Sequence, residues 1–334
     1  MLIALFLMLA AAPSFEETFR TGLLALQRND LDSARTSLES AAKLAPNNGR
    51  VWVALSQTYW KLKDNGKADA AAARAETLSA NDPVAMSSLA IYYGEAGHAL
   101  KSAEAQARYS ALVPQDTDAR LRAETLYFNA AQPLLQQGDF AGAITILHSA
   151  AARLNESAQI QLALGVAYYG LRRFDDAAGA FLRTIAIAPE TEQPYSFLGK
   201  FLDQIPGRLS EVTKVFSAYE AANPSEAAGY FLHAKALNAQ SADPATARRL
   251  LEKALAINER EAPTHFELGV VFDRTQSYAE AAREFERAAA LDPGDPATHY
   301  RLSRIYDRLG RPEAAQAERD LHSKLEKAQQ DAVR

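Results

Sequence analysis

The chain of 334 residues contains no cysteine, and this absence removes several classes of chemistry. Disulfide bonds, thiolate catalysis, cysteine-ligated zinc and a lipid anchor on an N-terminal cysteine are all excluded. Positive charge is not in excess either, because 36 lysines and arginines face 41 acidic residues and leave a net charge of −5. A nucleic-acid-binding face needs concentrated positive charge, so these interleaved charges argue against a nucleic-acid partner.

Sequence motifs for catalysis are also missing. The serines lack a Gly-x-Ser-x-Gly elbow, and no glycine-rich phosphate loop is present. The pair Asp175 and Asp176 falls at the turn into a helix, where acidic side chains favour the helix N-terminus. We therefore expect no enzymatic activity, no cofactor, no metal site and no small-molecule substrate.

The histidines are weak candidates for metal ligands. His265 and His299 occupy one repeated position, where we predict that the imidazole packs between helices, and His233 on a first helix is interpreted in the same way. His98 and His322, together with His148, have no carboxylate partner at ligand spacing in the sequence.

Strand signals are lacking, and what is present is typical of helices. Of all residues 48% are hydrophobic, much of this being alanine, and no alternating strand pattern occurs. Alanine with interspersed lysine, arginine and glutamate favours an all-helical fold.

The first residues, MLIALFLMLAAAPS, form the only long apolar run that affects the cellular location. The run is shorter than the roughly 20 residues of a transmembrane helix, and it ends in small residues that a signal peptidase accepts. We predict a signal peptide, with cleavage after Ala12 or after Ser14, or an uncleaved N-terminal anchor. The protein is then exported, periplasmic or envelope-associated, and membrane contact involves only this segment. It is cytoplasmic if the run is not a signal.

Two stretches, LALGVAYYGLRRFDDAAGAFLRTIAIAP (162–189) and ELGVVFDRTQSYAEAAREFERAAALDP (267–293), repeat one pattern. Their closing prolines lie about three units of 34 residues apart. The matching positions of the first stretch are Leu164, Gly165, Tyr168, Phe174, Ala177, Phe181 and Pro189. This pattern resembles the tetratricopeptide repeat, a helix–turn–helix unit. The resemblance implies an all-α, right-handed superhelical solenoid of about nine units with a C-terminal capping helix.

The repeats also divide the chain. The divisions are a signal peptide or anchor (1–14), three repeats (15–114), a linker or an extended helix start (115–123), six repeats (124–323) and a C-terminal cap or tail (324–334). The interval 115–123 is the predicted break, because the spacing there exceeds one unit, and Pro133 is expected to kink the following helix.

In the family, the first helices of successive units line a concave groove that holds a peptide or a partner helix. Carried over to this sequence, the resemblance implies the groove residues Phe128, Leu162, Val166, Tyr169, Lys200, Phe231, Lys235, Phe266, Val270, Tyr300 and Arg304, with Asp203 and Asp273 between them. Apolar area with charges at its rim suits a peptide ligand. A carboxylate clamp of the chaperone-binding type is not expected, because Lys200 and Lys235 lack its asparagine partners.

The predicted function is therefore a protein-binding scaffold, in the bacterial cell envelope if the signal is real. The alternative is a non-catalytic subunit of a polysaccharide-modifying or secretion enzyme complex. The identity of the partner cannot be read from a repeat fold.

Overall fold

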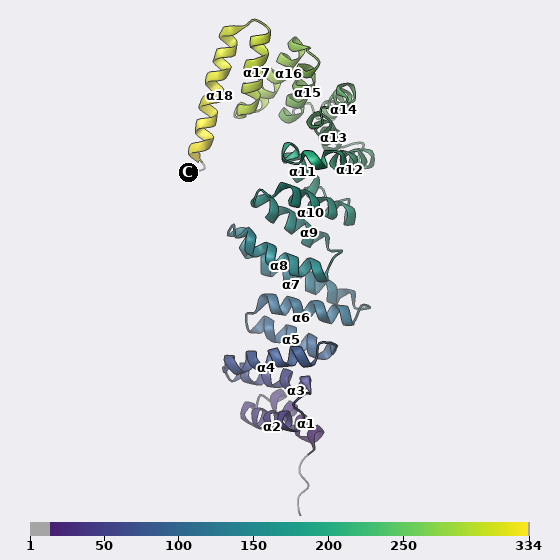
Figure 1. The fold of residues 1–334 in the computed structure, drawn as a ribbon, viewed down its shortest axis with the longest axis vertical. Coiled ribbons are helices and arrows are strands. Elements are labelled where there is room, and N and C mark those ends of the chain that lie inside the picture. Colours follow the sequence, from purple (N-terminus) through teal and green to yellow (C-terminus); the bar gives the residue numbers. More distant parts are fainter. Residues whose placement is uncertain (1–13, 333–334) are drawn as a thin grey trace, which may run out of the picture. The chain divides into compact units, whose positions relative to one another are not determined.

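The computed structural model describes residues 14–332, and every regular element in this range is helical (Figure 1). Residues 1–13, which carry most of the predicted signal peptide or anchor, lie outside the described range. The chain divides between Leu171 and Arg172 into two compact units, here called the N-terminal unit and the C-terminal unit. The described range contains eighteen consecutive α-helices, so the predicted all-helical repeat solenoid is confirmed.

The N-terminal unit contains four helix pairs and one further helix. The helices are α1 (Phe15–Gln27), α2 (Leu31–Leu44), α3 (Gly49–Lys61), α4 (Asn65–Leu78), α5 (Pro83–Glu95), α6 (Ala99–Leu112), α7 (Thr117–Gln136), α8 (Phe140–Arg153) and α9 (Ala158–Gly170). In each of the four pairs the first helix packs against the second, and the second helix packs against the first helix that follows it.

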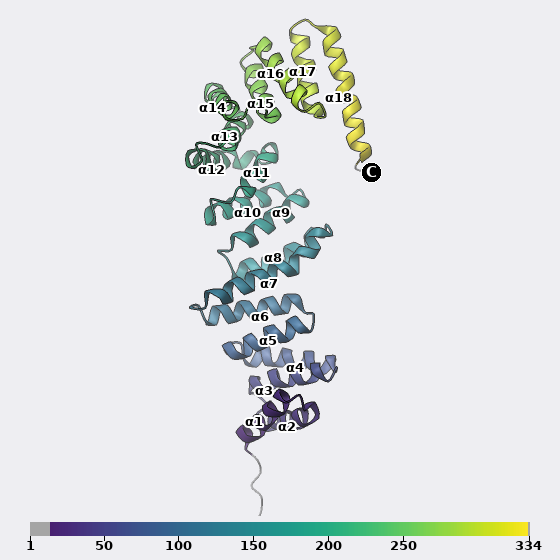
Figure 2. The same cartoon turned by 180° about the vertical axis from the view of Figure 1, so that it is seen from behind.

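The C-terminal unit begins with α10 and continues with four pairs. The helices are α10 (Phe174–Ile187), α11 (Gln193–Lys200), α12 (Leu209–Ala222), α13 (Ala227–Ala239), α14 (Pro244–Ile257), α15 (Ala262–Arg274), α16 (Tyr278–Leu291), α17 (Pro296–Arg308) and α18 (Pro312–Ala332). The pair α15–α16 lies between α13–α14 and α17–α18, as both views show (Figures 1 and 2).

The turn inside a pair depends on one residue with a positive φ. Gly97, Gly138 and Gly310 supply it between α5 and α6, α7 and α8, and α17 and α18, with φ from 69° to 81°. The amide of the next residue then donates back into the helix, for example from Arg311 to the Tyr306 carbonyl at 2.9 Å. Glycine adopts this left-handed conformation without steric cost and reverses the chain at once.

Small residues let the two helices of a pair approach closely. A Cβ atom added to Gly269 on α15 would lie 2.8 Å from the ring of Phe285 on α16. Gly22 on α1 faces Leu38 on α2 in the same way, at 2.7 Å. Since real Cβ contacts are longer than this, the glycine position of the repeat is required by packing.

Consecutive repeats are joined by a recurring hydrogen bond. A ring N–H or hydroxyl near the start of a first helix donates to a carbonyl six residues earlier, in the loop that ends the preceding repeat. The pairs are Trp52 with Pro46 (2.9 Å), Tyr195 with Pro189 (2.9 Å), Tyr230 with Pro224 (3.0 Å), His265 with Glu259 (3.0 Å) and His299 with Pro293 (3.1 Å). These contacts fix each loop against the helix that follows it.

Three segments differ from a regular repeat. Residues 117–123 form the first turns of α7, a single helix that continues through Pro133 and packs along α6. The sixth pair has a short α11 followed by the 3₁₀ turns Leu202–Gln204 and Pro206–Arg208. Residues 324–332 continue α18 and do not form a separate element.

Candidate functional site

The candidate site is a pocket of about 150 Å³ on the C-terminal unit, formed by the first helices of successive repeats. Its wall comes from the turn after α11 and from α13, α15 and α17. The lining residues are Leu202, Asp203, Lys235, Asn238, Ala239, Phe266, Glu267, Val270 and Arg301. Each element contributes because equivalent repeat positions face the same side.

Glu267 is a buried acidic residue in the lining of this pocket, with 8% of the residue exposed. Burial raises the pKa of its carboxyl above the ordinary 4.5, and a hydrogen bond from Asn238 opposes this effect in part. The Asn238 side-chain amide donates to Oε2 of Glu267 at 2.8 Å and to its carbonyl at 3.2 Å.

Asn238 is itself held in place from the other side. Arg274 donates to the Asn238 side-chain oxygen at 3.2 Å and to the carbonyl of Ala242 at 2.9 Å. The chain of contacts from Arg274 through Asn238 to Glu267 joins α13 to α15. Because each member has a partner, the polar base of the pocket is rigid.

Two cations and one exposed acid stand around this base. Lys235 on α13, Arg301 on α17 and Asp203 after α11 line the pocket together with Phe266 and Val270 of α15. Arg301 is 3.9 Å from Asp273, which Arg308 also contacts. The pocket therefore combines apolar walls with charged side chains.

The structure brings part of the predicted groove together. Lys235, Phe266 and Val270 line the pocket, while Phe231, half-buried, and the exposed Lys200 lie on the neighbouring first helices α13 and α11. Tyr300 and Arg304 lie on α17 and are exposed, Tyr300 by 44%.

The remaining predicted groove residues belong to the N-terminal unit. Phe128 lies on α7, and Leu162, Val166 and Tyr169 lie on α9; all four side chains are half-buried. All four residues lie on first helices, as the repeat pattern predicts, and their role in binding stays a prediction.

Sequence reasoning did not find Asn238, Glu267 and Arg301. Glu267 directly follows the predicted Phe266, and Asn238 comes one turn after the predicted Lys235, so the register pointed near them. What the sequence could not show is that Asn238 and Glu267 face each other across two helices.

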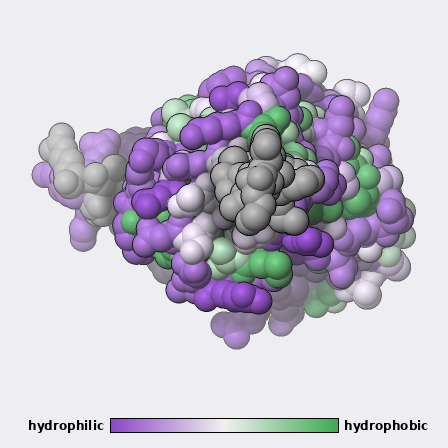
Figure 3. Space-filling view, turned by 90° about the horizontal axis from the view of Figure 1, so that it is seen from below, coloured by the Kyte–Doolittle hydropathy of each residue, from purple (hydrophilic) through white to green (hydrophobic). Residues whose placement is uncertain are grey.

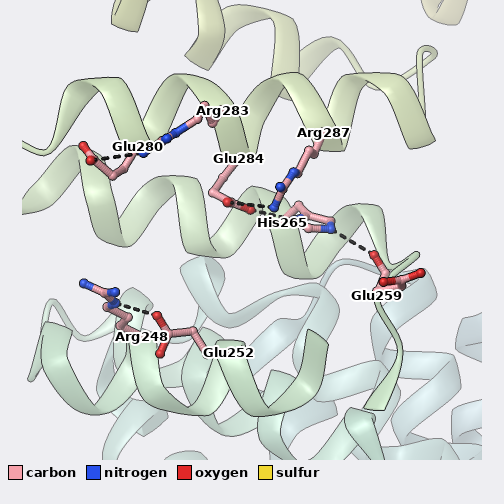
Figure 4. A network of polar contacts seen from close by, with 8 residues as sticks. All are labelled: Arg248, Glu252, Glu259, His265, Glu280, Arg283, Glu284 and Arg287. Atoms are coloured by element: carbon pink, nitrogen blue, oxygen red, sulfur yellow. Dashed lines mark hydrogen bonds and ion pairs between the residues drawn. The ribbon is translucent and has the colours of Figure 1, made fainter. Parts of the chain in front are cut away.

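The histidines pack between helices, as predicted, but they are also bonded to carboxylates. His265 on α15 contacts Glu284 of α16 at 2.7 Å, and Arg287 contacts the same carboxylate at 3.3 Å (Figure 4). His299 repeats the arrangement with Glu318 at 2.6 Å. Both imidazoles join the two helices of a repeat and are buried.

The expectation that His98 and His322 have no carboxylate partner is wrong. His98 lies 2.9 Å from Asp69 on α4, which belongs to the preceding pair, and His322 lies 3.6 Å from Glu326, one turn further along α18. The first partner is distant in sequence, and the tertiary fold supplies it. Within residues 14–332 no group of three or more His, Asp or Glu side chains is arranged for a metal ion.

The acidic pair Asp175 and Asp176 lies where it was expected. Asp175 and Asp176 stand in the first turn of α10, and Asp176 is 2.8 Å from Arg173.

None of the helices within the described range combines the length and the apolar character needed to cross a membrane. Seen from the α1 end, the visible surface is mainly hydrophilic, with hydrophobic side chains in small separate groups (Figure 3).

Two sequence models of the tetratricopeptide repeat match the chain. One matches residues 134–201 and 274–324, and the other matches residues 19–83 and 237–296. Together these matches cover well over half of the chain. A comparison with curated proteins gives no match.

Several solved structures have a similar fold. TTC0263, described as a thermophilic TPR protein in Thermus thermophilus, is 24% identical over 52% of this chain and 98% of that chain, with a TM-score of 0.43. PilW, described as a type IV pilus biogenesis factor, is 18% identical over 58% of this chain and 90% of that chain, with a TM-score of 0.48. A structure of MamA is 18% identical over 62% and 94%, with a TM-score of 0.35.

Proposed function

The chain belongs to the tetratricopeptide-repeat family, and we propose that it is a scaffold that holds a segment of a partner protein against the first helices of its C-terminal unit. Repeats of this family generally act as non-catalytic platforms for protein–protein interaction. The pocket between α13, α15 and α17 is the observation that carries the proposal.

The chemistry of this pocket favours binding over catalysis. Its lining residues include no serine, threonine, tyrosine or histidine, and its buried carboxylate, Glu267, is hydrogen-bonded to Asn238. Phe266 and Val270 offer apolar contact, and Lys235 and Arg301 supply charges that fix the position of a ligand. Aromatic anchors surrounded by polar groups are the usual centre of a protein interface.

A crosslinking pull-down from the native host tests the proposal. The bait is the full chain, compared with a variant in which Phe231, Phe266 and Tyr300 are changed to alanine. We expect the variant to lose a defined partner that the original chain captures. Capture of the same partner in the same amount by both chains would contradict the proposed face.

The control must remove apolar area elsewhere on the same unit. Ile257 at the end of the second helix α14 is 47% exposed, so Ile257→Ala changes an apolar side chain without touching the first helices. This control is expected to capture the partner at the original level. Circular dichroism of all three chains checks that the repeats stay folded.

We also propose that the protein acts without enzymatic activity of its own, cofactor or nucleic-acid partner, because the repeats occupy nearly all of the described chain. Turnover of a substrate by the purified chain alone would contradict this part of the proposal.

Export to the periplasm or envelope is a separate proposal, supported by the apolar run at residues 1–12. Ser14 caps α1, since its hydroxyl accepts the amide of Glu17 at 3.3 Å. Cleavage after Ala12 keeps this cap, whereas cleavage after Ser14 removes it, so the first site is favoured. Mass spectrometry of the mature protein tests this: an intact Met1 in a cytosolic protein contradicts export.

A further inference from the structure

Cationic side chains recur at one repeat position on the first-helix face of the C-terminal unit, and each lies over an aromatic ring of its own helix. The distances from the charged group to the ring centre are 4.9 Å for Lys200 over Phe197, 5.8 Å for Lys235 over Phe231 and 5.8 Å for Arg304 over Tyr300. Cations within about 6 Å of a ring centre are attracted to its face. The aromatic residue stands one helical turn before the cation in all three.

These three cations have no ion-pair partner within residues 14–332. The second helices of the same unit differ, because Arg248 there pairs with Glu252 at 2.7 Å and Arg283 with Glu280 at 3.2 Å (Figure 4). The positive charges of Lys200, Lys235 and Arg304 are therefore available to a ligand, whereas those of Arg248 and Arg283 are neutralised within the fold.

The acidic groups on the same face do not cancel this charge. Asp273 forms an ion pair with Arg308 and lies 3.9 Å from Arg301. Glu267 is buried and accepts a hydrogen bond from Asn238 at 2.8 Å, and within the described residues it forms no ion pair with Lys200, Lys235 or Arg304. Asp203 is the remaining acid in the pocket lining. A protein with a net charge of −5 thus presents an excess of positive charge here.

We propose that the partner segment bound by this face is acidic, with carboxylates that pair with Lys200, Lys235 and Arg304 and an apolar side chain that enters the pocket at Phe266 and Val270. This inference rests on the proposed function and adds the chemical class of the ligand. Charge complementarity of this kind sets which partner is accepted and how fast it binds. Asp203 and Asp273 between the cations favour separated carboxylates over the closely spaced phosphates of a nucleic acid.

Synthetic peptides test the proposal. The probe is a fluorescent peptide of about a dozen residues that combines glutamates with leucine and phenylalanine, long enough to cross neighbouring first helices. Two matched peptides carry glutamine or lysine in place of every glutamate. Binding to the full chain is measured by fluorescence anisotropy at low salt and at about 0.3 M salt, where screening of exposed charges is strong.

The protein variants are chosen to separate position from total charge. The test variant is Lys200→Gln, Lys235→Gln and Arg304→Gln on the first helices. The control variant is Arg248→Gln, Lys253→Gln and Arg283→Gln, which removes the same charge from the second helices α14 and α16. Thermal unfolding followed by circular dichroism confirms that both variants are folded.

We expect the glutamate peptide to bind about tenfold more tightly than the glutamine peptide, to lose this advantage in the test variant and at high salt, and to keep it in the control variant. Equal affinity of the peptides, preference for the lysine peptide, no binding of the glutamate peptide, or an unchanged preference in the test variant overturns the inference. Tighter binding of a single-stranded oligonucleotide of equal charge does so too.

This result is distinguishable from failure of the proposed function. If the pull-down partner is lost with the aromatic variant of Phe231, Phe266 and Tyr300 but retained by the charge variant, the scaffold function stands and the acidic ligand is rejected. If neither variant affects capture, the face itself is the wrong one.

Discussion

The Nδ1 atom of His265 lies 2.7 Å from a carboxylate oxygen of Glu284, in a pair whose side chains are only 6% and 12% exposed (Figure 4). The other ring nitrogen donates to the carbonyl of Glu259 at 3.0 Å. One imidazole therefore joins both helices of its repeat to the loop that closes the preceding repeat. His299 does the same one repeat later, with Glu318.

His265→Ala is expected to lower the free energy of unfolding by about 2 kcal/mol, because Glu284 stays buried with one partner fewer. His265→Tyr should cost less, since Tyr230 at the equivalent position donates to the matching carbonyl at 3.0 Å. Urea unfolding, with amide exchange in α15 and α16, measures both. Unchanged stability of the alanine variant contradicts this account of the pair.

Gly269→Ala is expected to destabilise the C-terminal unit by about 1 to 3 kcal/mol, because overpacking pushes α15 away from α16. The new methyl group would lie 2.8 Å from the ring of Phe285. Gly179→Ala in α10 is the matched control, with its nearest neighbour 3.5 Å away, so it is expected to be neutral or stabilising. Thermal unfolding compares the two; equal effects contradict the close approach of the pair.

Acid should weaken the N-terminal unit partly through Asp82. Hydrogen bonds from Arg50 hold the pKa of this carboxyl below its ordinary value of 3.8, and backbone amides of α5 add to the effect. A lowered pKa in the folded state means that its stabilisation is present above pH 3.8 and is lost as the pH falls through the folded value. We expect Asp82→Asn, which keeps a capping side chain, to flatten this part of the stability profile. An identical acid profile for both chains argues against it.

The pKa of Glu267 is shifted in the opposite direction from that of Asp82. Burial raises the pKa of its carboxyl, so its favourable contribution is complete below the ordinary value of 4.5 and is lost as the pH rises through the folded value. Glu267→Gln keeps an oxygen that accepts from Asn238 and removes the buried charge. We expect the variant to be more stable than the original chain at neutral pH, and this gain to vanish in acid. Urea unfolding at both pH values measures the difference, and a loss of stability at neutral pH contradicts the burial argument.

The fold could be predicted from the sequence because the same residue types recur where the two helices of a repeat pack together. Gly269 and Phe285 recur in register with Gly22 and Leu38, and each pair closes two helices at the same point. The prolines mark loops whose carbonyls accept from Tyr195 and similar residues. Local spacing determines these contacts, so one chain reveals them.

The site was only partly predictable, because its contacts cross between repeats. Asn238 and Glu267 are 29 positions apart, and nothing in either repeat alone announces that their side chains meet. The short α11 and its 3₁₀ turns were also not foreseen, since the spacing of the sixth repeat is nearly regular. The pairing of His98 with Asp69 could not be predicted either, because this contact also joins two different repeats.

The most direct test of the account places a photoreactive benzoylphenylalanine on the chain, at Tyr300 on α17 or at Ile257 on α14, in the native host. Both positions are exposed, and they lie on a first and a second helix of the C-terminal unit. We expect one defined crosslinked partner from position 300 and none from position 257. The same partner from both positions, or only from position 257, would contradict binding on the first-helix face.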